Sequence, residues 1–583
     1  MTPVSFAGTV GYLHEAPGDC LVVMAGAVGY EHLCTQRMWC ELGDRIAAAG
    51  YPALRFDWAG CGDASGSDAD PARCHAWEAS LRDALAYARD RLGARRIAIV
   101  AMRHGALIAA KVAAEDQAIE AVALLAPPTS GRYHARELAA LAQVIGTRPP
   151  PPGVKALPDG DFELAGFLVT AETQRDMGRY DLRTLGACPA ASLLVVAQPE
   201  QSSTEAICSH LVSLGAHVRS GTFDGYQDLM VEPTFSKMPD LALGKVIEWL
   251  KQSVPLGTPA APIVACGPAL LAGDGFFEES VILTGEGPLV ALWCRPNLGG
   301  RDAAVIFVSA GRTPHMGWAR MNVEFARRLA RDGITSLRID IGGLGDSPPV
   351  AGRRAQVLYD DAPRRDIAVA VEALKRAGFT RITLVGLCSG AHLAFHTAVE
   401  HEEVTGLVLV NLQKFIWRTS DRLEIVLRNT FRSNKYYKSE IWRRATWLRL
   451  MRGDIHFAGI ARAVSKRFAR TLRNRAASAG RGIGLVDDDT AKVQRWFRSL
   501  SARNVRGLVV YSAEDGGLDE LTLHMGSQAH LLTRLPGMSL SIIEGADHNM
   551  TPAWSRRQLC DELRAFLMAD AASADVPVPQ AAQ

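Results

Sequence analysis

The stretch RITLVGLCSGAHLAF, residues 381–395, decides the fold of its part of the chain. Its start is an apolar run typical of a buried strand, and its end is rich in small residues typical of a helix. Between the two stands Gly386-Leu387-Cys388-Ser389-Gly390, a turn that presents a nucleophile between a strand and a helix. The glycines permit the tight turn, and the start of a helix stabilises a thiolate. The spacing predicts Cys388 as the nucleophile, and the backbone N–H of Ser389 as half of an oxyanion hole.

A second turn of the same kind lies near the start of the chain. The stretch RRIAIVAMRHGALIAA begins at Arg95, and Arg103 stands in it where Cys388 stands in the other turn. Upstream of the two turns, RMWCELGDRIAAAGYPALRFDWAGCGDASG from Arg37 matches RMNVEFARRLARDGITSLRIDIGGLGDSPP from Arg320 without a gap. Matching residues are 283 positions apart in these two stretches and 285 positions apart at the two turns. Such a steady offset predicts two copies of one fold.

Each copy alternates short apolar strands with helical stretches that are rich in Ala, Leu and Arg. This pattern is typical of a mostly parallel sheet flanked by helices, and the strands are apolar enough to be covered on both faces. The predicted fold class is therefore α/β, with two tandem domains. We expect the first domain over residues 1–252, a Pro- and Gly-rich linker over 253–275, the second domain over 276–570 and a disordered tail over 571–583.

A nucleophile of this kind needs an acid and then a histidine, in that order along the chain. The strand in GLVVYSAEDGGLDE is followed by Asp515, and the strand in LSIIEGADHNMTP is followed by His548. We expect His548 to be the general base and Asp515 to orient it, with Asp519 as the alternative acid. The second N–H of the oxyanion hole is expected in the loop after VIFVSAG, from Gly311 or Arg312.

Two other histidines are weaker candidates. His392 follows Cys388 by about one helical turn and is expected to be a packing residue. His315 lies in the loop after Gly311 and could contact a substrate.

In the first copy, the three catalytic positions fall on Arg103, Gln201 and Asp228. Arginine stays protonated and cannot act as a nucleophile, so this copy is expected to be a degenerate hydrolase domain. It is expected to support the second copy, as an intramolecular pseudo-dimer, or to hold a substrate or carrier. Two roles for Arg103 stay open: a salt bridge that fills the former pocket, or anion binding together with His104 at a helix N-terminus.

The Gly386–Gly390 turn, the LRIDIGGLGDS segment, Asp515 and the GADH that ends at His548 resemble the motifs of α/β-hydrolases. The resemblance is strongest to serine-aminopeptidase-like and thioesterase-like members, and it covers nearly the whole chain, twice. The first copy and the segment that follows the strand VTGLVLVNL in the second copy are also similar to hydrolases encoded beside bacterial exopolysaccharide or exosortase systems. This second resemblance implies that the protein works together with acyl ligases and acyl carrier proteins. Cysteine in place of serine departs from the common pattern. Dienelactone hydrolases and some lactam- or lactone-forming thioesterases share that departure, so it does not imply inactivity.

A basic insertion follows the strand VTGLVLVNL, and we expect it to form a helical lid over residues 413–500. Residues 414–498 contain 21 Lys or Arg but seven Asp or Glu, although the whole chain has a net charge of +2. The lid could be solvated without a partner. Nucleic acid is disfavoured as a partner because no nucleic-acid motif accompanies the charge. An anionic acyl donor, acyl-CoA or an acyl carrier protein, fits the charge best.

The composition excludes several other classes of protein. Hydrophobic residues make up 48% and charged residues 22%, as in ordinary globular proteins. No apolar run approaches the roughly 20 residues of a transmembrane helix, and no signal peptide is visible. The 11 cysteines are scattered without zinc-type spacing, so we expect no metal or redox cofactor and a reducing, cytoplasmic location.

The sequence therefore predicts an acyl-processing enzyme. Cys388 would attack a thioester or ester, and the acyl group would pass to water, an amine or a hydroxyl. Two alternatives stay open: a plain esterase or peptidase that acts on a small soluble substrate, and a scaffold or binding protein without catalytic activity.

Overall fold

The computed structural model describes residues 1–583 except 147–149, 258–262, 266, 354–357, 419–487 and 570–583. The chain forms two compact units. The first unit contains residues 1–147, 155–300 and 312–351, and the second contains 148–154, 301–311 and 352–583. Most of the predicted lid and all of the predicted tail lie outside the described residues. The predicted domain boundaries follow the sequence repeat and stay a prediction.

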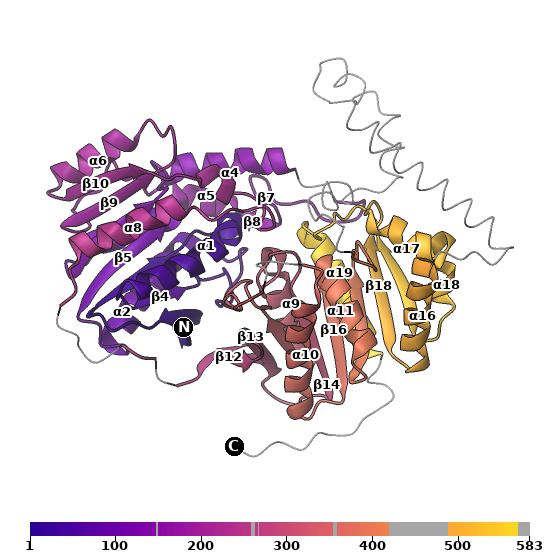
Figure 1. Cartoon of the computed structure of the whole chain (residues 1–583). Helices are drawn as coiled ribbons and strands as arrows, with labels where there is room; N and C mark the ends of the chain where they lie inside the picture. Colours follow the sequence, from indigo (N-terminus) through magenta and orange to yellow (C-terminus); the bar gives the residue numbers. More distant parts are fainter. Residues whose placement is uncertain (147–149, 258–262, 266, 354–357, 419–487, 570–583) are drawn as a thin grey trace. The chain divides into compact units, whose positions relative to one another are not determined.

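An eight-stranded sheet organises the first unit (Figure 1). The order of its strands is β1-β2-β4-β3-β5-β6-β9-β10, and its neighbours from β4 to β10 are parallel. The two pairs at the other edge are antiparallel. The strands are β1 (Thr2–Phe6), β2 (Thr9–His14), β3 (Cys20–Ala25), β4 (Ala53–Phe56), β5 (Arg96–Met102), β6 (Ile119–Leu125), β9 (Ser192–Ala197) and β10 (His217–Thr222).

Helices cover both faces of this sheet. The helices α1 (Gly29–Ala48) and α8 (Asp240–Ser253) pack on one face. The helices α2 (Arg73–Asp90), α3 (His104–Glu115) and α6 (Thr204–Ser213) pack on the other. Between β6 and β9 the chain forms α4 (Gly131–Ile145), the hairpin β7 (Phe162–Leu164) and β8 (Phe167–Val169), and α5 (Ala171–Met177). The short helix α7 (Tyr226–Leu229) follows β10.

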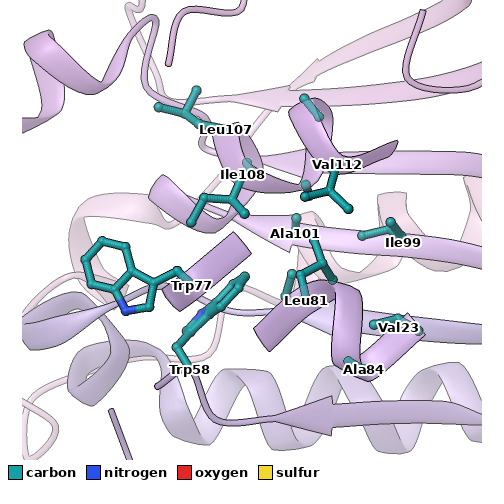
Figure 2. Close-up of a cluster of buried hydrophobic side chains, with 14 of the residues drawn as sticks. Val23, Trp58, Trp77, Leu81, Ala84, Ile99, Ala101, Leu107, Ile108 and Val112 are labelled. Carbon is teal, nitrogen blue, oxygen red and sulfur yellow. The ribbon is translucent and has the colours of Figure 1, made fainter. Parts of the chain in front are cut away.

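The apolar strands form two cores because successive side chains of a strand point to opposite faces. In β5, Ile99 belongs to the cluster under α2 and α3, while its neighbour Val100 belongs to the cluster under α1 and α8. Trp77 and Leu81 of α2 are four residues apart and so share one helix face. Figure 2 shows both side chains in the cluster that contains Ile99. Each such buried side chain stabilises the fold by about 1.5–3 kcal/mol.

The first unit also contains the start of the second sequence repeat. Four neighbouring strands pair antiparallel there: β11 (Ala269–Gly273), β12 (Phe276–Thr284), β13 (Pro288–Pro296) and β15 (Thr335–Ile339). The 3-10 helix η1 (Trp318–Arg320) and the helix α9 (Met321–Arg331) precede β15.

The second unit is built on five parallel strands. In spatial order they are β14 (Ala303–Val308), β16 (Arg381–Leu387), β17 (Val404–Val410), β18 (Arg506–Ser512) and β19 (Met538–Ile543). The described helices of this unit are α10 (Asp361–Arg376), α11 (Ser389–Glu400), α16 (Asp488–Ala502), α17 (Gly517–Met525), η3 (Ser527–Ala529), α18 (His530–Thr533) and α19 (Ala553–Met568). Among the described residues, no helix combines the length and the apolarity that crossing a membrane requires.

The strand registers repeat together with the sequence. Cys20 pairs with Arg96 between β3 and β5, and their counterparts in the second repeat, Ala303 and Arg381, pair between β14 and β16. The pairing of β5 with β6 shifts its register after Ile97, and the pairing of β16 with β17 shifts its register after the counterpart, Ile382. The structure confirms the predicted α/β class with mostly parallel sheets, and the sequence repeat extends to the backbone pairing.

Candidate active site

Cys388 lies between β16 and α11 in a backbone conformation that residues other than glycine rarely adopt, with φ of 53° and ψ of −116°. The two glycines of the turn make this conformation possible. A Cβ on Gly386 would meet the carbonyl oxygen of Gly390, and a Cβ on Gly390 would lie 2.7 Å from the carbonyl oxygen of Ser309. Strained residues of this kind gather at functional sites, which supports a chemical role for Cys388.

His548 and Asp515 form the acid–histidine pair of the second unit. His548 Nδ1 lies 2.6 Å from Asp515 Oδ2, and both side chains are buried. The other carboxylate oxygen of Asp515 accepts hydrogen bonds from the Gly517 N–H at 2.8 Å and from Gln413 Nε2 at 2.6 Å. Asp515 is therefore fixed by partners on three sides and holds the imidazole of His548 in one orientation. The alternative acid, Asp519, lies one helical turn further on, in α17.

The environment of His548 favours its charged form. Burial by itself would lower the pKa of His548. The charges of Cys388 and Asp515, and the hydrogen bond to Asp515, raise that pKa well above its ordinary value. A protonated imidazole beside a cysteine is an arrangement that activates a thiolate nucleophile.

The loop after β14 reaches the same turn. The Gly311 N–H donates a hydrogen bond of 2.7 Å to Ser389 Oγ, so this loop is held at the start of α11. The first turn of a helix has backbone N–H groups without helical partners, and Ser389 begins α11. Arg312 belongs to the first unit, and burial lowers its pKa. The oxyanion-hole assignment of Ser389, Gly311 and Arg312 stays a prediction.

Sequence reasoning missed Tyr359. Its buried ring stacks on Trp417, with centroids 4.4 Å apart and an interplanar angle of 9°. Burial raises the pKa of Tyr359 well above its ordinary value, and the charge of Cys388 raises it further. The phenol is therefore close enough to Cys388 for the two groups to influence each other electrostatically. No motif surrounds Tyr359, so the sequence contains no signal for its position.

Two further polar residues that sequence reasoning missed directly follow β17. Gln413 Nε2 lies 3.2 Å from His548 Nδ1, in addition to its bond to Asp515. Asn411 Nδ2 donates to the His548 carbonyl oxygen at 2.7 Å. The sequence signal for both residues is the run Asn-Leu-Gln directly after an apolar strand. Residues that follow parallel strands lie at the same edge of the sheet as the other site residues. His392 is bonded to the Lys414 carbonyl oxygen at 2.8 Å and packs against Tyr359.

The matching turn of the first repeat keeps its shape but not its chemistry. Arg103 has φ of 54° and ψ of −126°, close to the values at Cys388. Its guanidinium is buried and lies 2.7 Å from Glu31 and 2.6 Å from Glu137. Burial by itself would raise the pKa of Glu31, but Arg103 and His134 lower it to about 2. Arg103 is thus neutralised by carboxylates of its own unit, in agreement with the salt-bridge alternative.

The other two degenerate positions form no relay. Gln201 donates to the Pro127 carbonyl oxygen at 3.1 Å. Asp228 is exposed and lies 3.3 Å from Lys237. Neither side chain has the contacts that His548 and Asp515 have in the second repeat.

His315 lies between two carboxylates in the first unit. Its Nε2 is 2.6 Å from Asp63 and its Nδ1 is 2.6 Å from Asp340. Burial would lower its pKa, but the two carboxylates raise it well above the ordinary value. Side-chain atoms of His315, Asp340 and Asp346 lie within 4.8 Å of one another, the spacing of a metal site. Because both ring nitrogens already bind carboxylates and Asp346 binds Arg55, this group fits an ion-pair network better than a metal site.

Two family models match the chain, one in each repeat. Residues 22–149 match the alpha/beta hydrolase fold, and residues 300–433 match the serine aminopeptidase family S33. The chain is thus a member of the α/β-hydrolase superfamily. The curated proteins gave no match to the sequence.

Solved structures to which the chain is similar include an esterase and a serine hydrolase. Est1E from Butyrivibrio proteoclasticus, solved with ferulic acid, is 15% identical, with a TM-score of 0.32 over 44% of this chain and 99% of its own. An α/β serine hydrolase without a lid from Xanthomonas campestris is 12% identical, with a TM-score of 0.29 over 50% of this chain and 94% of its own. An esterase from Pyrobaculum calidifontis is 17% identical, with a TM-score of 0.29 over 50% of this chain and 85% of its own.

Proposed function

We propose that this protein is a thioesterase or acyltransferase that forms a covalent acyl-enzyme on Cys388. The observation that carries the proposal is the strained turn at Cys388 in the same unit as the bonded pair of His548 and Asp515. Nucleophile, base and orienting acid then stand in the roles of a catalytic triad.

In the first half of the reaction, His548 takes the proton of the Cys388 thiol. The thiolate sulfur bonds to the carbonyl carbon of the donor, and the carbonyl oxygen becomes an oxyanion that the Ser389 N–H stabilises. The intermediate then collapses, and the bond from carbon to the leaving sulfur or oxygen breaks. The leaving group takes the proton from His548, and the acyl group remains on Cys388 as a thioester.

In the second half, an acceptor replaces the cysteine. Water, an amine or a hydroxyl attacks the acyl carbon while His548 takes the acceptor's proton, and that proton returns to the Cys388 sulfur as it leaves. Exchange of one thioester for another is nearly balanced in free energy, so a cysteine suits a donor that is itself a thioester. The excess of Lys and Arg over residues 414–498 supports an anionic donor, acyl-CoA or an acyl carrier protein.

The proposal includes a supporting role for the first repeat. Inside the first unit, Asp63 of the first repeat binds Arg338 and His315 of the second, and Arg55 of the first binds Asp346 of the second. These buried pairs support an intramolecular pseudo-dimer, in which a repeat without catalytic residues takes the place of a partner subunit.

The proposal is tested by intact-protein mass spectrometry after incubation with acyl thioesters of CoA and of a carrier protein. We expect a mass increase equal to the acyl group, and its loss in Cys388→Ala. The matched control is Cys208→Ala, which removes a half-buried cysteine of the first repeat and should keep the adduct.

The outcomes separate the alternatives. An adduct that also persists in Cys388→Ala would overturn the assignment of the nucleophile. Turnover of small soluble esters without any reaction of CoA or carrier thioesters would favour a plain esterase. Absence of both adduct and turnover, with a Cys388 that alkylates no faster than Cys208, would favour a scaffold.

A further inference from the structure

A cavity in the first unit is lined by residues of both sequence repeats. It is lined by Val28 and Gly29, which are the counterparts of Gly311 and Arg312 in the second repeat. The enclosed part of the cavity has a volume of about 50 Å³, and its mouth is open. The first unit therefore contains a small, partly open space outside the proposed active site.

The lining of this cavity is mostly apolar and comes from both sequence repeats. Leu33 of α1, Leu138 of α4, Phe167 of β8 and Met177 of α5 come from the first repeat. Met316 comes from the second repeat, and all five side chains belong to the first unit. Methionine side chains adapt to flexible ligands, because a thioether is unbranched and polarisable.

The carboxylate and the two guanidinium groups of the lining already have partners inside the protein. Arg320 donates to the carbonyl oxygens of Gly62, Ala64 and Gly66 at 2.7–2.9 Å. Asp68 accepts from the Leu168 N–H at 2.9 Å, and Arg73 donates to the Ser67 carbonyl oxygen.

The remaining basic side chain of the described lining is His32. Burial lowers its pKa to about 4, so its imidazole is neutral at pH 7. A charged ligand would therefore lose its hydration without gaining an unpaired counter-charge, which disfavours its binding here.

We propose that this cavity binds an uncharged aliphatic chain, as a free lipid-like molecule or as the hydrocarbon part of a larger one. Uptake of an apolar chain by such a cavity is favourable, because it removes the apolar surfaces of both the chain and the lining from water. The inference does not depend on catalysis at Cys388. It gives the degenerate repeat a binding role that is distinct from its contacts with the second repeat.

The test is isothermal titration of the full-length Cys388→Ala protein with 1-alkanols of increasing chain length. The Cys388→Ala background removes any reaction of the alkanol as an acyl acceptor, so the result is independent of the proposed enzymatic activity. We expect saturable binding with one site per chain and an optimum in chain length. Absence of saturable binding at every chain length would overturn the proposal.

Three variants locate the site. Leu138→Trp fills the cavity and should weaken the affinity at least tenfold. Its matched control, Tyr133→Trp, places the same side chain on the exposed side of α4 and should bind as before. Phe167→Ala enlarges the cavity at a half-buried position and should shift the optimum to a longer alkanol. This variant tests the proposal even if Leu138→Trp fails to fold. Equal affinities in all three variants would overturn the proposal.

Discussion

Asp63 and Asp346 stand at matching positions of the two repeats, and each binds the matching arginine of the other repeat. Asp63 Oδ1 lies 2.7 Å from Arg338, and Asp346 Oδ1 lies 3.0 Å from Arg55. Both aspartates and both arginines are buried in the first unit. Exchange of equivalent contacts is the pattern of a two-fold interface, here within one chain.

Substitution of Asp63 by Asn should destabilise the protein strongly. The amide that replaces the carboxylate cannot neutralise the buried side chains of Arg338 and His315, which Asp63 pairs with. Loss of one partner of a buried ion pair lowers the free energy of unfolding by about 3–5 kcal/mol. The free energy of unfolding, measured with denaturant, checks this expectation. The control is Asp224→Asn, which breaks an exposed pair with Lys245 and should cost at most about 1 kcal/mol. Equal effects of the two substitutions would contradict the interpretation.

The buried pair of Glu31 and Arg103 should make stability depend on acid pH. The pKa of Glu31 is about 2 in the folded protein, below its ordinary value of 4.5. Its contribution, of about 3 kcal/mol, is therefore complete above pH 4.5 and is lost as the pH falls toward 2. Glu31→Gln should be less stable than the natural protein at pH 7, and the difference should shrink between pH 4.5 and 2. A difference that stays constant over this range would show that Glu31 is not the titrating group.

Asp515→Asn should slow acylation of Cys388 by about 10²- to 10⁴-fold, because the amide no longer fixes the histidine tautomer or its charge. Asp519→Asn tests the alternative acid and should leave the rate nearly unchanged. Stopped-flow measurement of leaving-group release follows both variants. The reverse result would assign the acid to Asp519.

Tyr359→Phe should slow acylation by about tenfold or more, because it removes a buried hydroxyl close to Cys388 that can donate to the thiolate. The variant keeps the ring that stacks on Trp417, so the fold around the turn should be preserved. Single-turnover kinetics, with near-UV circular dichroism as a check of packing, measure the effect. An unchanged rate would mean that the phenol takes no part in the chemistry.

The sequence by itself indicated the features that depend on short stretches of chain. The turn at Cys388 is recognisable because one strand, two glycines and one helix specify it locally. Asp515 and His548 were predicted from their places after two strands, since parallel strands bring their carboxyl ends to one edge of a sheet. The repeat was visible because its offset hardly changes along the chain, and the strand registers keep the same correspondence.

The tertiary structure decided which side chains from distant segments meet. Tyr359 stacks on Trp417, and Glu137 neutralises Arg103, through contacts that no local pattern encodes. His315 was a candidate for substrate contact, yet in the structure two carboxylates hold it, one of them 252 residues away. Such pairings depend on how loops cross and how strands are placed side by side. Only the packing of the whole unit, where each buried charge must find a partner, determines these features.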